Sequence, residues 1–405
     1  MALNTALTGI NAAQTDLNVI ANNIANANTA GFKGSRAEFA DVYAVTGLNL
    51  NSIATGSGVR TQDVAQQFGQ GDIETTSNSL DMAIRGNGFF VVNDGSGPVY
   101  TRAGAFHKSA DDFVETSTGA RLQVYPPNGI GGFDTSTLTD LKLLSSQSNA
   151  TATSLITLNS NLPASATVPA TAFSPSDATS FNAATPVTVY DSQGGAHQAT
   201  IYYVKTATNT WDAHLYVDGN NAGTQSLSYD TSGNLASPAN GTLAFNAVNL
   251  GNGSNPLTLS LNVAKTTQFG TDFAAGSIEQ NGFEAGTLSN IDIDSKGVVT
   301  AYYSNNQSTQ LGQIAIANFS NVQGLRQLGN TSWAASGDSG VPQMGTAGTG
   351  TFGSLQSGAL ETSNTSDTTA QLVNMIKAQR NYQANAQVLS TDSTLATTLF
   401  NAVGR

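Results

Sequence analysis

The sequence predicts a multidomain protein, in which a terminal α-helical coiled coil joins mainly all-β domains: an inner discontinuous β domain and an inserted outer β domain. Three observations lead to this fold class. Apolar residues recur at helical spacing at both ends of the chain, and the middle changes to a two-residue alternation. The 405 residues are also enough for two or three domains.

The first predicted element is an N-terminal helix of about 24 residues, which would be about 36 Å long. Its apolar residues recur at spacings of three, four and seven, and small residues such as Ala6 and Ala13 fill the rest of the stripe. The members of the stripe are Leu3, Leu7, Ile10, Leu17, Ile20 and Ile24. Asp16 is the only charged side chain in this segment, and we expect the helix to end at NTAGFKG, where Gly31 and Gly34 follow a run of Asn.

A second helix is predicted at the C-terminal end, because neither Pro nor Gly interrupts residues 368–403. Ser366 or Asp367 is a suitable N-cap. The apolar residues assigned to this helix are Leu372, Met375, Ile376, Tyr382, Leu389, Leu395 and Leu399. The two helices could pair within one chain, which would make both stripes an intramolecular seam, or mainly with other subunits. The periodicity leaves both possibilities open, and the low surface charge favours packing between subunits.

Between these ends the apolar period is two, as expected for strands. SLDMAIRGNGFFVVND (79–94) alternates and then becomes an apolar run, and VTVYDSQGGAHQATIYYVK (187–205) has the form of a hairpin that turns at Gly194-Gly195. GVVTAYYSNNQSTQLGQIAIANF (297–319) predicts another hairpin. The stretch 147–185 is rich in Ser, Thr, Ala and Pro, and we interpret it as a crossing linker plus an irregular strand.

Similar turns and strands on both sides of the middle suggest that one β domain is interrupted by another, because insertions are tolerated at exposed loop tips. We therefore predict four parts. These are terminal helices (1–30 with 365–405), a linker region (31–71 with 359–364), an inner β domain (72–146 with 280–358) and an outer inserted β domain (147–279).

Composition limits the possible functions. The formal net charge of -12, with only 15 Lys+Arg, argues against nucleic acid and anionic lipid as partners. Charged residues make up 10%, well below the usual ~25%. Cysteine is absent, so no disulfide or thiolate metal site is possible. No stretch approaches the ~20 apolar residues of a membrane span, and MALNTALTGINAAQTD has no basic and apolar leader regions, so we expect no cleavable signal peptide.

No chemical motif stands out, and we expect no catalytic, cofactor or metal site. His107, His197 and His214 lack a second ligand at a metal-binding spacing, and we interpret them as surface or hairpin residues. DIDSKG (292–297) faintly resembles a calcium loop but lacks the closing Glu, so a β-turn is the better interpretation. Asp111-Asp112 is also better explained as a turn than as a pair of catalytic carboxylates.

Two terminal motifs resemble those of the bacterial flagellar rod and hook axial proteins, most closely the hook members of that family. They are ANNIANANTAGFKGSRAEFADVYA (21–44) and LVNMIKAQRNYQANAQVLSTDSTL (372–395). The segments 187–205, LGQIAIANFSNVQGLRQLGNTSWAASGDSG (311–340) and GSLQSGALETSNTS (353–366) are similar to the hook members in particular. The resemblance covers most of the chain and is weakest in 218–256.

The resemblance implies a structural, non-enzymatic subunit of a tubular helical homopolymer, which acts as a flexible universal joint and transmits motor torque from rod to filament. It implies that the two apolar stripes are subunit interfaces, and that Gly31, Phe32 and Lys33 form a linker contact; the alternative for these three is an ordinary helix stop with a buried aromatic ring. It also implies an extracellular place in the flagellum. The implied partners are a distal rod protein, a hook cap, hook-filament junction proteins and the flagellar type III export apparatus.

Three other functions remain as alternatives. A rod or hook-associated axial protein would lack the inserted 147–279 domain. A secreted β-rich adhesin would not explain matched amphipathic helices at both ends of the chain. A glycan-active enzyme would need a carboxylate pair, and none stands out in the sequence.

Overall fold

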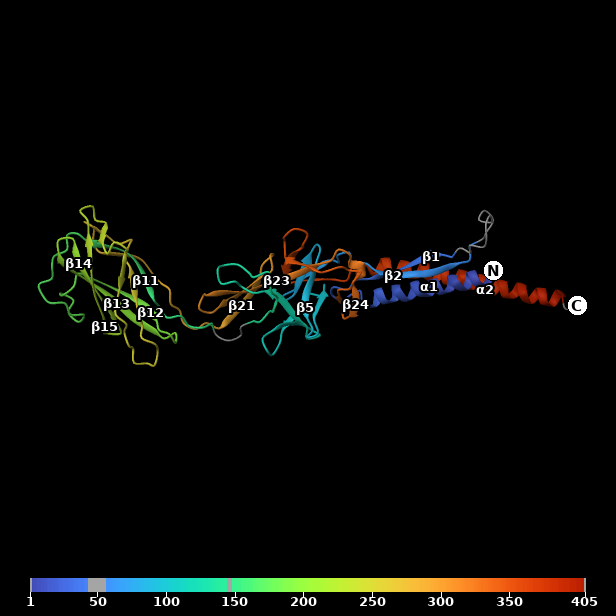
Figure 1. Ribbon diagram of the computed structural model, residues 1–405, viewed down its shortest axis with the longest axis horizontal. Coiled ribbons are helices and arrows are strands. Elements are labelled where there is room, and N and C mark those ends of the chain that lie inside the picture. Colours follow the sequence, from blue (N-terminus) through green and yellow to red (C-terminus); the bar gives the residue numbers. More distant parts are fainter. Residues whose placement is uncertain (1, 43–55, 144–147, 404–405) are drawn as a thin grey trace. The chain divides into compact units, whose positions relative to one another are not determined.

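The structure of the 405-residue chain is a computed structural model that describes residues 2–42, 56–143 and 148–403 (Figure 1). It contains two compact units. Unit 1 comprises Met1–Leu143, Asn290–Ala301 and Ser308–Arg405, and unit 2 comprises Leu144–Ser289 and Tyr302–Gln307. Both ends of the sequence therefore belong to one unit. The predicted division into four parts is finer than these two units and stays a prediction. Residues 43–55 and 144–147 of the predicted parts lie outside the described residues.

Both predicted helices are confirmed. α1 spans Ala2–Ala25 and α2 spans Thr368–Val403. Asp367 caps α2, because its Oδ1 accepts a hydrogen bond from the backbone N–H of Ala370 at 3.0 Å. Within the described part of the chain, neither helix is both long and apolar enough to cross a membrane.

Unit 1 contains a β body beside the helices. An antiparallel ladder of β1 (Ser35–Asp41) and β2 (Val59–Gln66) follows α1. The main sheet has 12 strands among the described residues. Its main path runs through β21 (Leu288–Ile293), β22 (Val298–Tyr303), β23 (Ser308–Asn318), β9 (Arg121–Tyr125), β5 (Phe89–Asn93), β6 (Pro98–Thr101), β25 (Ser332–Ala334) and β24 (Arg326–Gly329).

Shorter strands complete unit 1. Paired beside the main path are β7 (Phe106–Lys108), β8 (Val114–Thr116), β10 (Thr139–Asp140) and β26 (Gln343–Thr346). A short 3-10 helix, η1 (Val322–Gly324), precedes β24. Two further ladders join distant parts of the sequence: β4 (Met82–Arg85) with β27 (Ser354–Ser357), and β3 (Ile73–Thr75) with β28 (Ala359–Glu361). The segment just before α2 is thus hydrogen-bonded to the segment that leads into the β body.

The apolar run in β5 reflects burial on both faces of the main sheet. Phe90 and Val92 belong to one hydrophobic cluster, whereas Phe89 and Val91 belong to another. Because successive strand residues point to opposite faces, a strand covered on both sides has no polar alternation. The predicted hairpin at 297–319 is confirmed, since β22 and β23 are neighbours in this sheet.

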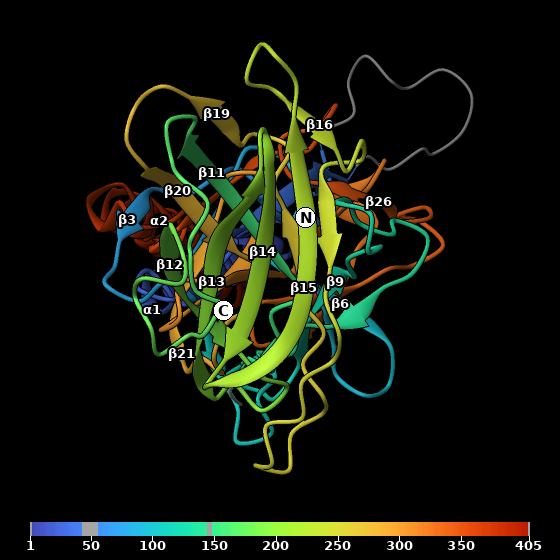
Figure 2. The ribbon, with the colours of Figure 1, turned by 90° about the vertical axis from the view of Figure 1, so that its left-hand side faces the viewer.

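Unit 2 is built from two five-stranded sheets of the described residues. One is an antiparallel meander of β12 (Ala183–Tyr190), β13 (Ala196–Ala207), β14 (Thr210–Val217), β15 (Asn220–Tyr229) and β16 (Leu235–Ser237). Figure 2 shows β13, β14 and β15 side by side. The other sheet contains β17 (Thr242–Ala244), β18 (Ser260–Asn262), β11 (Leu155–Pro163), β19 (Thr267–Phe269) and β20 (Ala274–Gln280). The predicted hairpin at 187–205 is confirmed as β12 and β13.

The irregular strand predicted within 147–185 is found as β11. It has nine residues, pairs with β18 and β19 in parallel and with β20 in antiparallel orientation, and its register against β20 shifts between Leu158 and Ser160. Ile156, Leu158 and Leu162 are buried in the core of unit 2. Ser160 is buried on the same face of the strand, and the polar residues that alternate with them are half-buried or exposed.

The core of unit 2 lies on the inner side of the meander. Trp211, Ala213, Leu215 and Val217 alternate into it along β14. Trp211 is fully buried, and its Nε1 donates a hydrogen bond to Oε1 of Gln268 at 2.8 Å. The indole therefore keeps a polar partner inside an apolar cluster.

Replacing Leu215 by Ala should lower the free energy of unfolding of unit 2 by about 2–5 kcal/mol, since it leaves a cavity in this core. Amide hydrogen exchange of the β13–β15 peptides measures the effect. The matched control is Leu155→Ala in β11, because Leu155 is exposed. Equal losses in the two variants would contradict the described core.

Candidate functional site: the paired terminal helices and their linker

α1 and α2 lie side by side in unit 1, and α1 also contacts the β1–β2 ladder (Figure 1). The buried residues of the pair are mostly small. Ala6, Ala12 and Ala13 are buried on α1, and Ala378 is buried on α2. A Cβ atom on Gly9 would lie 2.5 Å from Oδ1 of Asn385, so the side chain of Asn385 packs directly on the backbone of α1 at this point. The seam within one chain is therefore made of small side chains.

The large apolar residues of α1 mostly lie outside this seam. Leu3 and Leu7 are exposed at 45% and 46%, and only Ile20 of the predicted stripe is buried. The half-buried members are Ile10, Leu17 and Ile24. An intramolecular seam therefore accounts for a small part of the stripe.

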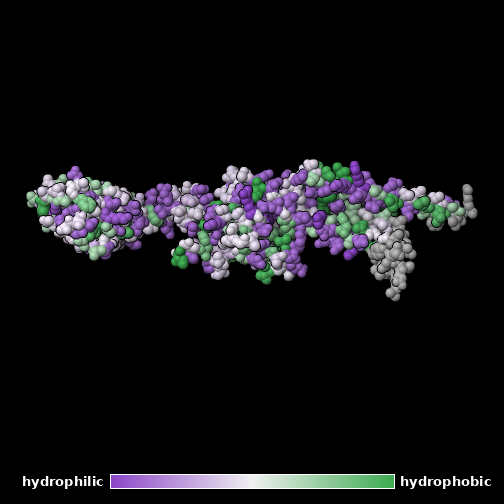
Figure 3. Space-filling model, turned by 90° about the horizontal axis from the view of Figure 1, so that it is seen from above, coloured by the Kyte–Doolittle hydropathy of each residue, from purple (hydrophilic) through white to green (hydrophobic). Residues whose placement is uncertain are grey.

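The predicted stripe of α2 is still more open. Leu395 and Leu399 are exposed at 64% and 67%. The other exposed members are Leu372, Ile376 and Tyr382, and the half-buried ones are Met375 and Leu389. Figure 3 shows apolar surface at the α2 end of the molecule, on the right. A single chain thus leaves uncovered most of the apolar surface that the sequence analysis assigns to subunit contacts, and the assignment itself stays a prediction.

The Asn-rich end of α1 is held by hydrogen bonds to its own chain. The side chain of Asn23 is buried and bonds both backbone groups of Ser35, donating to the carbonyl at 2.8 Å and accepting from the N–H at 2.9 Å. The hydroxyl of Thr365 donates to the Asn23 carbonyl at 3.1 Å. Oδ1 of Asn364 accepts from the N–H of Gly34 at 2.8 Å. These amides tie the end of α1 to the segment that leads into α2.

A buried ion network lies next to this junction. Nζ of Lys33 is 2.5 Å from Oε1 of Glu361 and donates to the carbonyl of Gly69 at 2.8 Å. Nη1 of Arg102 is 3.1 Å from Oε2 of the same carboxylate, and its Nη2 donates to the carbonyl of Gly86 at 2.7 Å. Glu361 thereby connects three segments: the chain that follows α1, the β body and the strand that precedes α2.

Burial opposes the charge on both cations of this network. It lowers the pKa of Lys33, although Glu361 opposes the shift and the neighbouring Arg102 adds to it. Burial likewise lowers the pKa of Arg102 against the opposing effect of Glu361. Lys33 and Glu361 have fully buried side chains, so the carboxylate is what makes the two buried positive charges tolerable.

The structure shows where each residue of the predicted linker contact lies within its own chain. Gly31 has a φ of +67°, and a Cβ there would lie 2.4 Å from the backbone N of Ala103, so the position requires glycine. Lys33 is 1% exposed, whereas Phe32 is half-buried. The alternative is a helix stop with a buried aromatic ring. Gly31 fits the helix stop, but the deeply buried side chain is that of Lys33 and not that of Phe32. Contact of this segment with another subunit stays a prediction.

Sequence reasoning missed Gly9, Asn385 and the Glu361 network. Ala6, Gly9 and Ala13 are spaced by three and four residues, and this spacing of small residues is a signal that could have identified the seam. Glu361 gave no such signal, because its two cationic partners are 328 and 259 residues away in the sequence.

The other sequence candidates form no chemical site. Asp294 accepts hydrogen bonds from the N–H groups of Lys296 and Val298 at 2.9 Å each, which confirms the turn predicted there. Asp112 has a φ of 69° and is paired with Lys108. Across residues 2–42, 56–143 and 148–403, no group of three or more His, Asp or Glu side chains could hold a metal ion.

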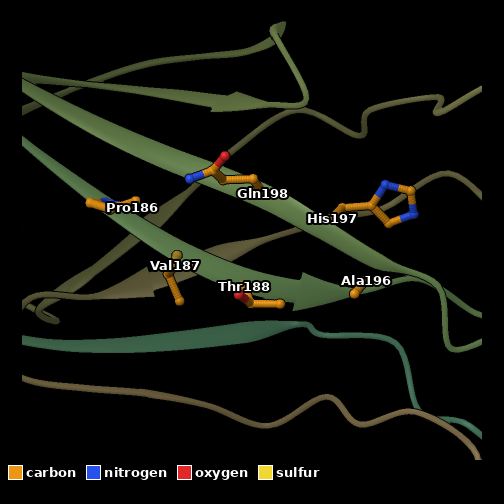
Figure 4. Close-up of a pocket in the computed structure, with 6 residues that line it drawn as sticks. All are labelled: Pro186, Val187, Thr188, Ala196, His197 and Gln198. Carbon is orange, nitrogen blue, oxygen red and sulfur yellow. The ribbon is translucent and has the colours of Figure 1, made fainter.

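A hollow of about 500 Å³ lies on the β12–β13 surface of unit 2 (Figure 4). It is lined by Pro186, Val187, Thr188, Ala196, His197 and Gln198. The hollow is shallow and open, and the imidazole of His197 is its only ionisable lining group. It lacks the converging polar groups of a small-molecule site.

Comparisons with known proteins match the chain along most of its length. "Flagella basal body rod protein" matches residues 3–33, and "Flagellar hook protein FlgE/F/G D1 domain" matches 83–182. "Flagellar basal body protein FlaE D2 domain" matches 157–283, and "Flagellar basal body rod FlgEFG protein C-terminal" matches 356–402.

Similarity to curated proteins extends over whole chains. The flagellar hook protein FlgE of Escherichia coli K12 is 40% identical over 417 residues, covering 99% of this chain and 100% of that protein. The chain belongs to the flagellar hook protein family. FlgE of Salmonella typhimurium is 39% identical with the same coverage, and FlgE of Borreliella burgdorferi is 30% identical with 97% of each chain covered.

One solved structure supports the fold of this hook protein family member. The Helicobacter pylori flagellar hook protein FlgE2 matches with a TM-score of 0.53 and 14% sequence identity, covering 71% of this chain and 100% of that one. The likeness supports a multidomain, mainly β fold and, at this identity, says nothing more about function.

Replacing Glu361 by Gln should destabilise unit 1 by roughly 3–5 kcal/mol, because it leaves two buried cations without their shared anion. Amide hydrogen exchange of unit 1 peptides measures the loss, and unit 2 peptides serve as an internal reference. The control is Glu74→Gln on the paired strand β3, where the side chain is exposed. A Glu361→Gln chain as stable as the control would show that the network contributes nothing.

Proposed function

We propose that the chain is a structural subunit of the bacterial flagellar hook, and that it assembles with its own copies into a tubular helical polymer. One observation carries the proposal: large apolar residues line α1 and α2, and the pair within one chain leaves most of them exposed. The family relationship supplies the biological setting.

A polymer follows from the kind of surface that is left open. An exposed apolar edge on paired helices is completed by helices of other subunits, in the manner of a coiled coil. When identical subunits join through interfaces that do not close a ring, they build an open helix. In this proposal, the terminal helices of 1–30 and 365–405 form the inner layer, and the predicted stripes are the contacts between copies.

A hook must bend while it transmits torque from rod to filament. Charged residues make up 10% of this chain, and neutral amides, hydroxyls and glycines replace them. Neutral hydrogen-bonding surfaces exchange partners at low cost, whereas buried ion pairs fix one arrangement. We propose that outer surfaces slide between subunits while the inner helices hold, so that the polymer acts as a flexible universal joint.

The further partners in this proposal are a distal rod protein at the base and hook cap and hook-filament junction proteins at the far end. Export through the flagellar type III apparatus without a cleavable signal peptide is part of the same proposal, and so is a linker contact by Gly31, Phe32 and Lys33.

Replacing both Leu395 and Leu399 by Asp should abolish polymerisation, since it places charges on the most exposed part of the predicted α2 stripe. The β fold should remain, because neither side chain is buried in the single chain. Negative-stain microscopy of concentrated or salted-out protein reports tubes, and circular dichroism reports the fold. The control is Val168→Asp with Val341→Asp, two exposed valines outside the helices.

The control variant should form tubes like those of the unchanged chain. Tubes of normal width from the Leu395→Asp, Leu399→Asp variant, at the same protein concentration, would refute the proposed role of the helix edge. Discrete particles from the unchanged chain under all conditions would instead favour a monomeric secreted protein.

A further inference from the structure

A cluster of ionisable groups in unit 2 centres on His197, one of the residues that line the hollow on the β12–β13 surface. His197 is the second residue of β13, Asp191 directly follows β12, and Asp218 directly follows β14. Asn252 comes from the loop between β17 and β18. Three separate connections of the unit thus meet at one imidazole ring.

Both ring nitrogens of His197 face carboxylates. Nδ1 is 2.5 Å from Oδ2 of Asp218, and Nε2 is 3.1 Å from Oδ2 of Asp191. A neutral imidazole has one N–H donor and one lone pair, so it can bond only one of two carboxylates. With both aspartates ionised, the two contacts therefore need a doubly protonated, positively charged ring.

The remaining contacts of the two carboxylates hold them in place. Oδ1 of Asp191 accepts from the N–H groups of Gln193 and Gly195 at 2.8 Å each, within its own turn. Oδ1 of Asp218 accepts from the N–H of Gln198 at 2.9 Å. Among the described residues, the charged groups paired with His197 are these two aspartates alone.

The side-chain amide of Asn252 lies close to both Asp191 and His197. Its Nδ2 donates to Oδ2 of Asp191 at 2.6 Å and lies 3.5 Å from Nε2 of His197. A side-chain amide carries two N–H groups. Asn252 can therefore donate one hydrogen to Asp191 and turn the other toward the ring nitrogen whenever that nitrogen becomes an acceptor.

The charge states agree with this geometry. Burial opposes protonation of His197, but hydrogen bonds to Asp218 and Asp191 outweigh it and raise the pKa of the ring. Burial also opposes ionisation of Asp191, yet hydrogen bonds from His197, Gly195 and Asn252 lower its pKa strongly. The hydrogen bond to His197 lowers the pKa of Asp218.

We propose that His197 is a proton-operated clasp, which joins the turn after β12 to the turn after β14 when charged and releases the Asp191 side when it loses a proton. The neutral ring keeps its Nδ1–H on Asp218, where the contact is shortest. Its Nε2 then accepts a hydrogen bond from Asn252. Deprotonation thus exchanges an ion pair for an amide contact and shifts the loop that carries Asn252.

The pH range follows from the signs of the shifts. Because folding raises the pKa of His197, its ion pairs stabilise the fold fully below the histidine pKa of the unfolded chain, about 6.5. This stabilisation is lost as the pH rises through the pKa of the folded state. The lowered aspartate pKa values add stability that is lost only as the pH falls through those values, on the acid side. The clasp is therefore closed in mildly acidic solution and opens as the pH rises through the raised pKa of His197.

The test is a ring-nitrogen NMR titration of the full chain labelled in histidine, from about pH 5 to about pH 9 around the ordinary histidine pKa. The chain has three histidines, and His197→Gln assigns the signal. We expect His197 to titrate above the ordinary histidine pKa of about 6.5 and above His214, and to become the Nδ1–H tautomer when neutral. A His197 midpoint at or below about 6.5 would overturn the proposal.

Two variants distinguish the proposed contacts of His197 from a general loss of stability of the fold. Asp218→Asn should move the His197 midpoint to lower pH, and Asn-Gly suits the tight turn that Asp218-Gly219 forms. Asp230→Asn, in the turn after β15, is the matched control and should leave the midpoint unchanged. Asn252→Ala should move it to higher pH, because the neutral ring loses its donor. An unchanged midpoint in Asp218→Asn, or in Asn252→Ala, would contradict the proposed exchange.

Discussion

A pair of helices whose seam is made of alanine and glycine cannot cover its own leucines. Buried alanines and Gly9, which packs against the side chain of Asn385, form the contact of α1 with α2, and Leu395 and Leu399 remain exposed. Isolated helices are marginal in water, and most helical stability in proteins comes from packing an apolar face. The remaining features of unit 1 can be understood from this constraint.

The Glu361 network anchors the helix pair to the β body. One carboxylate holds Lys33, which follows α1, and Arg102, which belongs to the body, while its own strand precedes α2. Ion pairs of this kind contribute specificity more than stability, because desolvation offsets much of the attraction. The helix surface carries few charges by contrast: Asp16 on α1, and Lys377, Arg380 and Asp392 on α2. Buried charges thus occur where the chain keeps one arrangement within unit 1.

Much of the fold could be predicted from the sequence, because the signals were periodic and local. The presence and length of α1 and the bounds of α2 followed from unbroken helical spacing, although α1 ends at Ala25, before the expected stop at NTAGFKG. The β12–β13 hairpin followed from alternation around a Gly-Gly turn. The bounds of β11 could not be predicted, because Thr and Asn alternate with its buried residues and the buried Ser160 is polar as well. The helix stripes were predicted as apolar surfaces, but the sequence could not show which side faces the partner helix.

The contacts that could not be predicted are those between residues far apart in the chain. Neither Lys33 nor Glu361 lies in a motif that indicates burial, and their pairing depends on β3 and β28 coming together. The His197 cluster is a similar case, since its histidine lies on β13 and the other three side chains come from three separate connections. Spacing rules detect neighbours on one helix or strand, and they carry no information about residues that only the tertiary fold brings together.

The most direct measurement is amide hydrogen exchange of α1 and α2 in the dilute chain and in the assembled polymer. If the apolar edges are completed only by other copies, both helices should exchange rapidly in the dilute chain, α2 most of all toward its C-terminal end, and become protected on assembly. The β strands of both units should be protected in both states. Helices that are already fully protected in the dilute chain would contradict the account.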